Sequence, residues 1–368
     1  MRNQIYSIAK VRRFARTAIF GGAFCVLMSF VFLHMAQSSP APDSHSALQI
    51  YFVDVEGGQS TLFVTPEGKS LLVDTGWPGN DGRDADRIVA AAKLAGISKI
   101  DYVLLTHYHT DHTGGVPQLA ARIPIGTFID HGENREPTDD ATEQAWKAYQ
   151  ALLAEKHYKR IIAKPGESLP IPGMEVKVIS ADGALIEKPL PGAGADNPTC
   201  KTTEPSPADQ TENARSLGVL ITFGNLRILD LGDLTKDKER ELMCPVNKLG
   251  AIDIFVVSHH GWLQSDSPEL LNGIAPRVAI MDNGATKGGS PSVWDTIEKS
   301  PRLENLWQLH YSEEGGAAHN AAAPFIANFS GKTDAGNYIK LTASAHGSFD
   351  VYNARTKETK HYAYGAVR

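Results

Sequence analysis

A six-residue segment combines three histidines with an aspartate. His107, His109, Asp111 and His112 follow the order His-x-His-x-Asp-His, directly after an apolar run at residues 102–105. Residues two apart in an extended chain point to the same side, so His107 and His109 can approach one ion together. Three imidazoles and a carboxylate suit a borderline divalent cation such as zinc. The segment therefore predicts a metal site, and a solvent-facing loop rich in histidine is the alternative.

Regular elements that can position this segment begin at residue 48. Short apolar runs, typical of strands, alternate with stretches whose apolar residues have helical spacing. The predicted strands are 48–53, 60–64, 70–73, 102–105, 125–129, 217–223, 226–231, 252–257, 278–281, 306–309, 338–343 and 348–352. The predicted helices are 84–94, 113–121, 138–156, 234–243, 267–274 and 292–300.

This order of elements predicts an α/β (α+β) fold. Strands come first, and strand and helix then alternate twice, which favours two sheets packed face to face with helices outside. Residues 189–210 are rich in Pro, Gly, Asp and Thr and are interpreted as a long loop or insertion. Strand patterns resume on both sides of it, so we predict one domain over residues 48–368.

The first 38 residues differ from the rest of the chain. They hold five basic residues and no acidic ones, followed by an apolar run at residues 17–33. This pattern predicts an export signal peptide or, if it is not cleaved, an N-terminal anchor, followed by a flexible linker at residues 39–47. The protein is expected to be periplasmic or secreted.

Charge and cysteine content narrow the possible partners. Without the five basic residues, 31 Lys and Arg face 42 Asp and Glu, a net charge of −11. Such an acidic body repels a polyanion, so polymeric nucleic acid is a doubtful partner and a small substrate is favoured. Cys200 and Cys244 remain outside the signal and could form a disulfide in an oxidising compartment, but sequence leaves their pairing open.

The segment from His107 to Gly115 resembles the signature of the metallo-β-lactamase superfamily. Further motifs are similar in the same order: Asp74 in Leu-Leu-Val-Asp-Thr-Gly, Asp233 in Leu-Gly-Asp, and His259 with His260 in Ser-His-His-Gly. The resemblance covers most of residues 48–262 and implies a four-layer αββα sandwich with its site at one edge of the sheets.

A narrower resemblance concerns the hydrolase domain of ComEC-like competence proteins. The opening Phe-Val-Asp-Val-Glu-Gly-Gly-Gln-Ser at residues 52–60, the Ser-His-His-Gly motif and the Asn-Ala-Arg-Ser-Leu segment at residues 213–217 are all similar to that group. Trp262 departs from it, because a small residue is common at this position, and this change is expected to alter substrate access.

The resemblance implies a role for each motif residue. His107 and His109 would hold a first zinc ion, Asp111 and His112 a second, and Asp233 would bridge the two. A water between two cations loses its proton near neutral pH and can attack an ester, amide or phosphoryl centre. Asp111 would also orient that nucleophile and pass on its proton, which makes it the catalytic residue.

The remaining motif residues receive supporting or alternative roles. Asp74 is expected to support the loop by hydrogen bonds. His259 and His260 would point in opposite directions if their strand continued, so that only one would ligate, with His259 slightly favoured. Both are kept as metal ligands.

Four further polar residues are weaker candidates. His131 could line the site or sit in a hydrogen-bonded surface turn, and His157 is expected to cap a helix. Asn213 is a possible polar contact to substrate. His310 ends a predicted strand and could contact substrate, although a plain surface histidine is the alternative.

These residues favour an exported metal-dependent hydrolase with two zinc ions, acting on a phosphodiester or related ester through a metal-bound hydroxide. A lactonase or β-lactamase is the alternative, since the same activated water opens cyclic esters and amides. The presence of both Asp111 and His112 counts against an oxidoreductase with one iron. A non-catalytic binding protein would not need the complete set of ligands.

Overall fold

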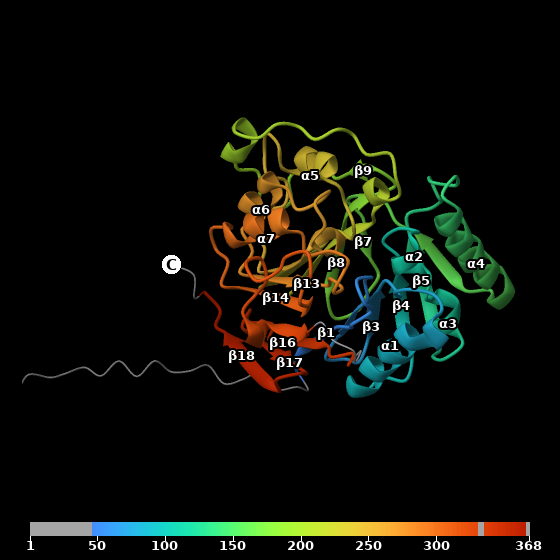
Figure 1. Ribbon diagram of the computed structural model, residues 1–368. Helices are drawn as coiled ribbons and strands as arrows, with labels where there is room; N and C mark the ends of the chain where they lie inside the picture. Colours follow the sequence, from blue (N-terminus) through green and yellow to red (C-terminus); the bar gives the residue numbers. More distant parts are fainter. Residues whose placement is uncertain (1–45, 330–334, 366–368) are drawn as a thin grey trace, which may run out of the picture. The chain divides into compact units, whose positions relative to one another are not determined.

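The computed structural model describes residues 46–329 and 335–365 (Figure 1). The predicted signal or anchor at residues 1–38 and the linker up to residue 45 lie outside the described residues. Within the described ranges, no helix combines the length and apolar character needed to cross a membrane. Export and the domain boundaries therefore stay predictions.

The first sheet carries the strands from both ends of the described chain. Its order is β18-β17-β16-β1-β2-β3-β4-β5-β6. Neighbours from β3 to β6 are parallel, and the other pairs are antiparallel. The strands are β1 (Leu48–Phe52), β2 (Thr61–Val64), β3 (Ser70–Val73), β4 (Ile100–Leu104), β5 (Ile125–Asp130), β6 (Lys159–Ile162), β16 (Ile339–Ala343), β17 (Phe349–Asn353) and β18 (Glu358–Tyr362).

The second sheet has the order β15-β14-β13-β12-β11-β10-β8-β7, with β9 paired to β8. Neighbours from β11 to β15 are parallel, and β7, β8, β10 and β11 pair antiparallel. The strands are β7 (Ser168–Leu169), β8 (Glu175–Ala181), β9 (Ala184–Leu185), β10 (Gly218–Phe223), β11 (Leu226–Asp230), β12 (Ile254–Val256), β13 (Val278–Met281), β14 (Asn305–His310) and β15 (Ile326–Asn328).

Helices cover the outer face of each sheet. Those on the first sheet are α1 (Arg83–Leu94), α2 (Thr110–Thr113), α3 (Val116–Ala120) and α4 (Asp140–Lys156), and those on the second are α5 (Lys236–Met243), α6 (Pro268–Ile274) and α7 (Pro291–Glu298) (Figure 1). Short 3-10 helices are η1 (Asn80–Gly82), η2 (Pro198–Lys201), η3 (Asn213–Arg215), η4 (Ser258–Gly261) and η5 (Ala323–Phe325).

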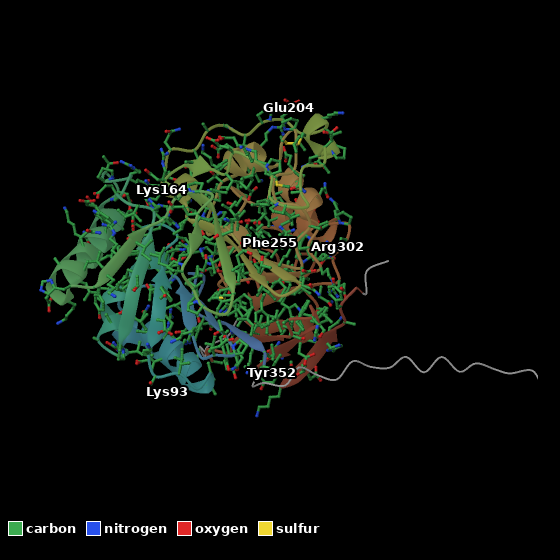
Figure 2. The ribbon with its side chains drawn as sticks, turned by 180° about the vertical axis from the view of Figure 1, so that it is seen from behind. Lys93, Lys164, Glu204, Phe255, Arg302 and Tyr352 are labelled. Carbon is green, nitrogen blue, oxygen red and sulfur yellow. A yellow bond between two sulfur atoms is a disulfide. The ribbon has the colours of Figure 1, made fainter. Side chains whose placement is uncertain are left out.

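Three apolar cores follow from the alternation of side chains along the strands. In β1, Ile50 and Phe52 belong to the core between the sheets, whereas Tyr51 belongs to the core beneath α1, α3 and α4. Successive side chains of a strand point to opposite faces, which produces this division. In the second sheet, Phe255 belongs to the core beneath α5, α6 and α7, and Figure 2 shows it in the interior, in contrast to Lys93 at the periphery. The predicted αββα sandwich is confirmed.

The predicted helix at residues 113–121 divides into α2 and α3. The break falls at Gly114 and Gly115. A Cβ on Gly115 would lie 2.1 Å from the carbonyl oxygen of Thr75, so only glycine permits this close approach of the two loops. The strands β6, β7, β8, β9, β15 and β18 were not predicted. Strands β7, β9 and β15 are too short to show an alternating pattern, whereas the seven-residue β8 was missed although Val176 and Val178 alternate in it.

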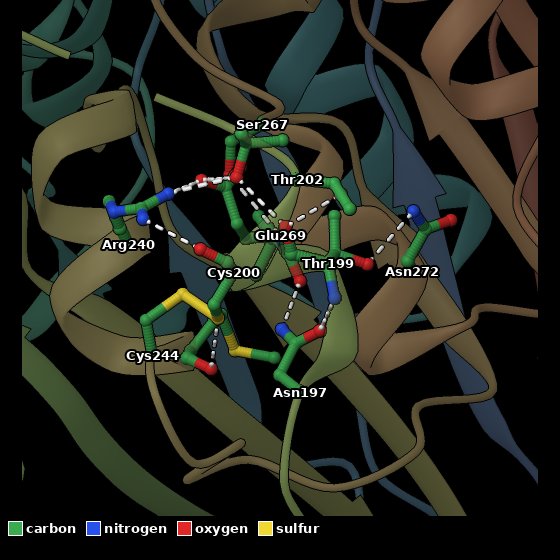
Figure 3. Close-up of a disulfide and its surroundings, with 12 residues drawn as sticks. Asn197, Thr199, Cys200, Thr202, Arg240, Cys244, Ser267, Glu269 and Asn272 are labelled. Carbon is green, nitrogen blue, oxygen red and sulfur yellow. Dashed lines mark hydrogen bonds and ion pairs between the residues drawn. A yellow bond between two sulfur atoms is a disulfide. The ribbon is translucent and has the colours of Figure 1, made fainter. Parts of the chain in front are cut away.

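The predicted loop at residues 189–210 is attached to the second helical layer. It contains η2 and an isolated bridge between Asp196 and Val246, and a Cys200–Cys244 disulfide links it to the end of α5. Around this disulfide, Arg240 pairs with Glu269 and donates to the carbonyl of Cys200 (Figure 3). The pairing that the sequence left open is therefore present.

Candidate metal centre

The histidine and aspartate motifs gather beyond the carboxyl ends of parallel strands. The segment from His107 to His112 follows β4, Asp233 follows β11, and His259 with His260 follows β12. Strand ends of two facing sheets meet along one edge, so residues more than 100 positions apart become neighbours. Gly232 permits this arrangement, since its φ is 56° and a Cβ there would lie 2.8 Å from that of Thr106.

Four ligand atoms converge closely at this edge. One atom from each of Asp111, His112, Asp233 and His260 lies within 4.8 Å of the others, and all four residues are buried. His112 Nε2 lies 3.4 Å from Asp111 Oδ2 and 3.3 Å from Asp233 Oδ1. His260 Nε2 lies 3.2 Å from Asp111 Oδ2.

The second oxygen of Asp233 faces a different pair of histidines. Its Oδ2 atom lies 3.9 Å from His107 Nε2 and 3.4 Å from His259 Nε2. The ring of His109 lies 4.7 Å from that of His107, centroid to centroid. Asp233 therefore stands between two groups of imidazoles and offers one oxygen to each.

Unpartnered polar atoms test whether these residues fit a metal. Asp233 Oδ1 and His107 Nε2 are buried and make no hydrogen bond to any described residue. Such atoms are costly unless a cation or proton occupies the space before them. A donor set of imidazole nitrogens and carboxylate oxygens suits a divalent transition metal. The described residues thus fit divalent metal binding.

Electrostatics keep the carboxylates of the cluster charged. Burial alone would raise the pKa of Asp111, but Lys287 and His112 hold it well below its usual range. Burial opposes ionisation of Asp233 as well, and His112 and His259 hold its pKa well below the usual range. Burial disfavours the charged form of His112, but the Asp233 and Asp111 carboxylates raise its pKa well above the usual value. A cation that binds here would release protons.

Carboxylates lie beside the outer ring nitrogens of two of the imidazoles. His112 Nδ1 donates to Asp74 Oδ2 at 2.7 Å, and Asp74 also accepts from the backbone and hydroxyl of Thr106. His260 Nδ1 lies 3.3 Å from Asp282 Oδ1. A carboxylate on one ring nitrogen leaves the other nitrogen free for a metal. Asp74 occupies the supporting position that its sequence motif indicated.

His109 has a comparable partner on the opposite side. Its Nε2 atom donates to Glu136 Oε2 at 3.1 Å, which leaves Nδ1 as the nitrogen with a free lone pair. Glu136 also accepts from the backbone of Glu212. Sequence reasoning missed Glu136 and Asp282. Asp282 could have been noticed because it directly follows a predicted strand, whereas Glu136 lies in a loop without a local signal.

The two adjacent histidines do not alternate as the sequence analysis expected. Strand β12 ends at Val256, and His259 and His260 lie in the η4 turn with φ of 53° and 56°. This turn lets both imidazoles face Asp233, at 3.4 and 3.6 Å. The expectation that only one could reach the site rested on a continued strand, and the strand does not continue. His260, not the favoured His259, joins the close group of four.

The weaker candidates lie outside this cluster. His131 Nε2 contacts Glu212 Oε2 at 3.0 Å, and its ring lies against that of Tyr108. Asn213 is half-buried in η3, and its Oδ1 has no hydrogen-bond partner among the described residues. His310 is buried and donates to Asp54 Oδ1 at 2.7 Å, so it is not an exposed surface residue. His157 is the C-cap residue of α4.

Comparison with known proteins relates part of the chain to a known superfamily. Residues 54–196 match the model of the Metallo-beta-lactamase superfamily. ComE operon protein 3 of Bacillus subtilis (strain 168) is 23% identical over 287 residues, which are 74% of this chain and 32% of that protein. A UPF0173 metal-dependent hydrolase of Polynucleobacter asymbioticus is 28% identical over 220 residues, 58% of this chain and 66% of that protein.

Among solved structures, the metallo-beta-lactamase fold protein YhfI from Bacillus subtilis has a TM-score of 0.43 at 12% identity, covering 71% of this chain and 95% of that one. The chain spans only about a third of the length of ComE operon protein 3. The matched residues 54–196 include the segment from His107 to His112 and end before Asp233. The chain therefore matches the metallo-beta-lactamase superfamily over residues 54–196 and resembles competence proteins of the ComEC type over most of its length.

Proposed function

We propose that this protein is an exported hydrolase with two zinc ions and that it acts on a small phosphodiester or related ester. The arrangement around Asp233 carries the proposal. Its Oδ1 faces His112 and His260, and its Oδ2 faces His107 and His259. A single carboxylate with a separate set of imidazoles at each oxygen is suited to bridging two cations.

Each group of residues has a defined task in this proposal. Zinc ions, when bound, supply activated water near neutral pH and neutralise charge that develops at the attacked centre. Asp111, His112 and His260 would hold one ion, and His107, His109 and His259 the other. Asp111 presents a charged carboxylate at the rim of the cluster, where it can orient the attacking water by accepting its proton.

Charge supports a small substrate over a polymer. The chain beyond residue 38 carries a net charge of −11, counted from its Lys, Arg, Asp and Glu residues. A polyanion would be repelled at long range, whereas a single phosphodiester is attracted by the local charge of bound cations. A lactone or β-lactam remains the second candidate, since its ring opening needs the same activated water.

Metal content and substrate preference test the proposal. Purified protein should contain about two zinc ions per chain and hydrolyse bis-p-nitrophenyl phosphate. Asp111→Ala should abolish this activity, while His346→Ala, an exposed histidine remote in sequence from every cluster motif, serves as the control. One iron per chain would contradict the proposal. Faster turnover of a lactone or cephalosporin than of any phosphodiester would favour the second candidate.

Export is the second part of the proposal. A Cys200–Cys244 disulfide supports an oxidising compartment, because cytosolic thiols are kept reduced (Figure 3). Cell fractionation and the mass of the purified chain test this location. A cleaved signal would give a periplasmic or secreted chain shortened by roughly 38 residues. A full-length chain with free thiols in the cytosolic fraction would contradict export.

A further inference from the structure

Lys287 reaches the metal cluster from a loop that the sequence motifs did not include. It lies between β13 and α7, and its Nζ contacts the carboxylate of Asp111 and the carbonyl oxygen of Gly57, the latter at 2.7 Å. Its side chain keeps 22% of its surface exposed. The ammonium group thus lies between the buried ligands and solvent.

The loop that carries Lys287 is held firmly against the histidine turn. Gly289 and Ser290 donate backbone hydrogen bonds to the carbonyls of His260 and Gly261, both at 2.9 Å. A Cβ on Gly288 would lie 2.1 Å from the carbonyl oxygen of His260. Only glycine fits this contact, so the chain places Lys287 at a fixed position relative to the metal ligands.

Two tryptophans border the ammonium group. Lys287 Nζ lies 5.4 Å from the ring centroid of Trp77 and 5.9 Å from that of Trp262. Both indoles are half-buried. Aromatic faces stabilise a cation and also limit its access to water. Trp262, the departure from the competence-protein pattern, therefore forms one wall around Lys287.

The charges around Lys287 and Asp111, at the solvent side of the metal cluster, favour an anionic ligand. Two divalent cations would outweigh the two carboxylates Asp111 and Asp233, and the ammonium of Lys287 would add further positive charge. Once Asp111 is engaged with a cation, Lys287 retains donors that need a new acceptor. A phosphoryl oxygen, charged and rich in lone pairs, satisfies both the ammonium group and the local positive charge.

We propose that Lys287 is a specificity-determining residue that binds a charged oxygen of the substrate beside the metal centre and so selects anionic phosphoesters over neutral esters. This inference rests on the proposed function. It adds that selection comes from a lysine outside the metal-binding motifs, placed by the loop at residues 284–290 and bordered by Trp77 and Trp262.

Binding of inorganic phosphate to the zinc-loaded protein tests this role without any turnover. Calorimetry should show phosphate affinity reduced about tenfold in Lys287→Ala, equal to about 1.4 kcal/mol, and partly restored in Lys287→Arg. Lys147→Ala, a strongly exposed lysine on α4, is the matched control. Zinc content of each variant is measured in the same samples, and circular dichroism confirms folding.

Kinetics provide a second and independent readout. Lys287→Ala should raise KM for bis-p-nitrophenyl phosphate by about tenfold and change KM for the neutral ester p-nitrophenyl acetate far less. Unchanged phosphate affinity, or equal losses on both substrates, would overturn the proposal. A loss of zinc in Lys287→Ala would also overturn it and assign Lys287 to holding Asp111.

If the proposed hydrolase function is wrong but the role of Lys287 is right, the binding and kinetic measurements give different results. If the wild-type protein binds phosphate through Lys287 but hydrolyses no phosphodiester, the anion site stands and the proposed reaction is wrong. If Lys287→Ala folds poorly, Lys287→Gln replaces it in the same phosphate titration. Its side chain is similar in length and carries no charge.

Discussion

Among the residues that the structure describes, two groups of carboxylates and histidines bring their ligand atoms close together, and the two groups differ in what balances their charge. One is the metal cluster of Asp111, His112, Asp233 and His260, and the other joins Asp54 and Glu56 to His310. In both groups, one ligand atom of each residue lies within 4.8 Å of those of the others. Residue types and proximity alone therefore do not separate the two.

The nearby cations and hydrogen bonds do separate them. In the second group, Arg87 Nη1 lies 3.2 Å from Asp54 Oδ2 and 3.8 Å from Glu56 Oε1, and His310 donates to Asp54 Oδ1. An arginine of the chain already supplies the positive charge. In the metal cluster, the ion pairs that Asp233 forms among the described residues are all with imidazoles, those of His107, His112, His259 and His260. A carboxylate paired with the chain's own guanidinium has a structural role, whereas a carboxylate surrounded by imidazoles is suited to a metal.

Removing Asp233, the carboxylate proposed to bridge the two cations, should have the largest effect. Asp233→Ala takes away an oxygen from both groups of imidazoles, so we expect loss of both zinc ions and an activity loss above about 100-fold, beyond that of an outer-partner variant. Metal analysis and turnover of bis-p-nitrophenyl phosphate measure this effect. Retention of two zinc ions per chain would contradict the bridging position.

Asp282→Asn should have a smaller effect on the same site. The amide cannot stabilise a positively polarised His260 as the carboxylate does, so zinc affinity should fall by roughly 10- to 100-fold. Competition with a chelator measures it. Asp350→Asn is the matched control, since Asp350 pairs with the distant His361 on the outer strands β17 and β18. Equal zinc affinity in both variants would mean that Asp282 does not orient the ligand.

Asp230 is a third case, a buried carboxylate whose hydrogen bonds with the described residues come from amide groups. Gln59 Nε2 and the backbone of Gly232 donate to it, and burial raises its pKa to about 7. Its bound proton therefore stabilises the fold below about pH 4, and this contribution is lost as pH rises through about 7. Relative to Asp230→Asn, the wild-type unfolding free energy should fall by roughly 2 kcal/mol from about pH 5 to about pH 8. Urea unfolding at each pH measures this, and parallel curves for the two proteins would show that Asp230 is ionised in the fold.

His310→Ala should have the smallest effect. It removes one buried hydrogen bond to Asp54, so the unfolding free energy should drop by about 1 kcal/mol while zinc content stays the same. Chemical unfolding and metal analysis check both expectations. A strong fall in turnover at unchanged zinc content and stability would instead support the substrate contact that the sequence analysis considered.

The αββα sandwich was predictable because its signals are local. Alternating apolar residues in β1 and helical spacing in α1 predict each element from a few neighbouring positions. The two-residue strands β7 and β9 carry no such pattern, since two residues cannot show a period. Both strands pair with β8, so their formation depends on the tertiary arrangement of the second sheet and not on a local pattern.

The metal motif was predictable for the same reason. His107, His109, Asp111 and His112 lie within six residues, and the chain itself brings them to one strand end. The turn at His259 and His260 was not predictable, because its positive φ angles depend on contacts with the loop at residues 284–290. A continued strand was the simplest local expectation, and it gave the wrong orientation of the two imidazoles.

By itself, the sequence determined the types of metal ligand, their order along the chain and the elements that carry them. Only the tertiary structure decided that Asp233 lies between two groups of histidines, that Arg87 forms an ion pair with Asp54, and that Lys287 contacts Asp111. Lys287 and Asp111 are 176 positions apart. Contacts of this kind arise when separate strand ends converge at one edge of a sandwich, and they leave no spacing pattern in the chain.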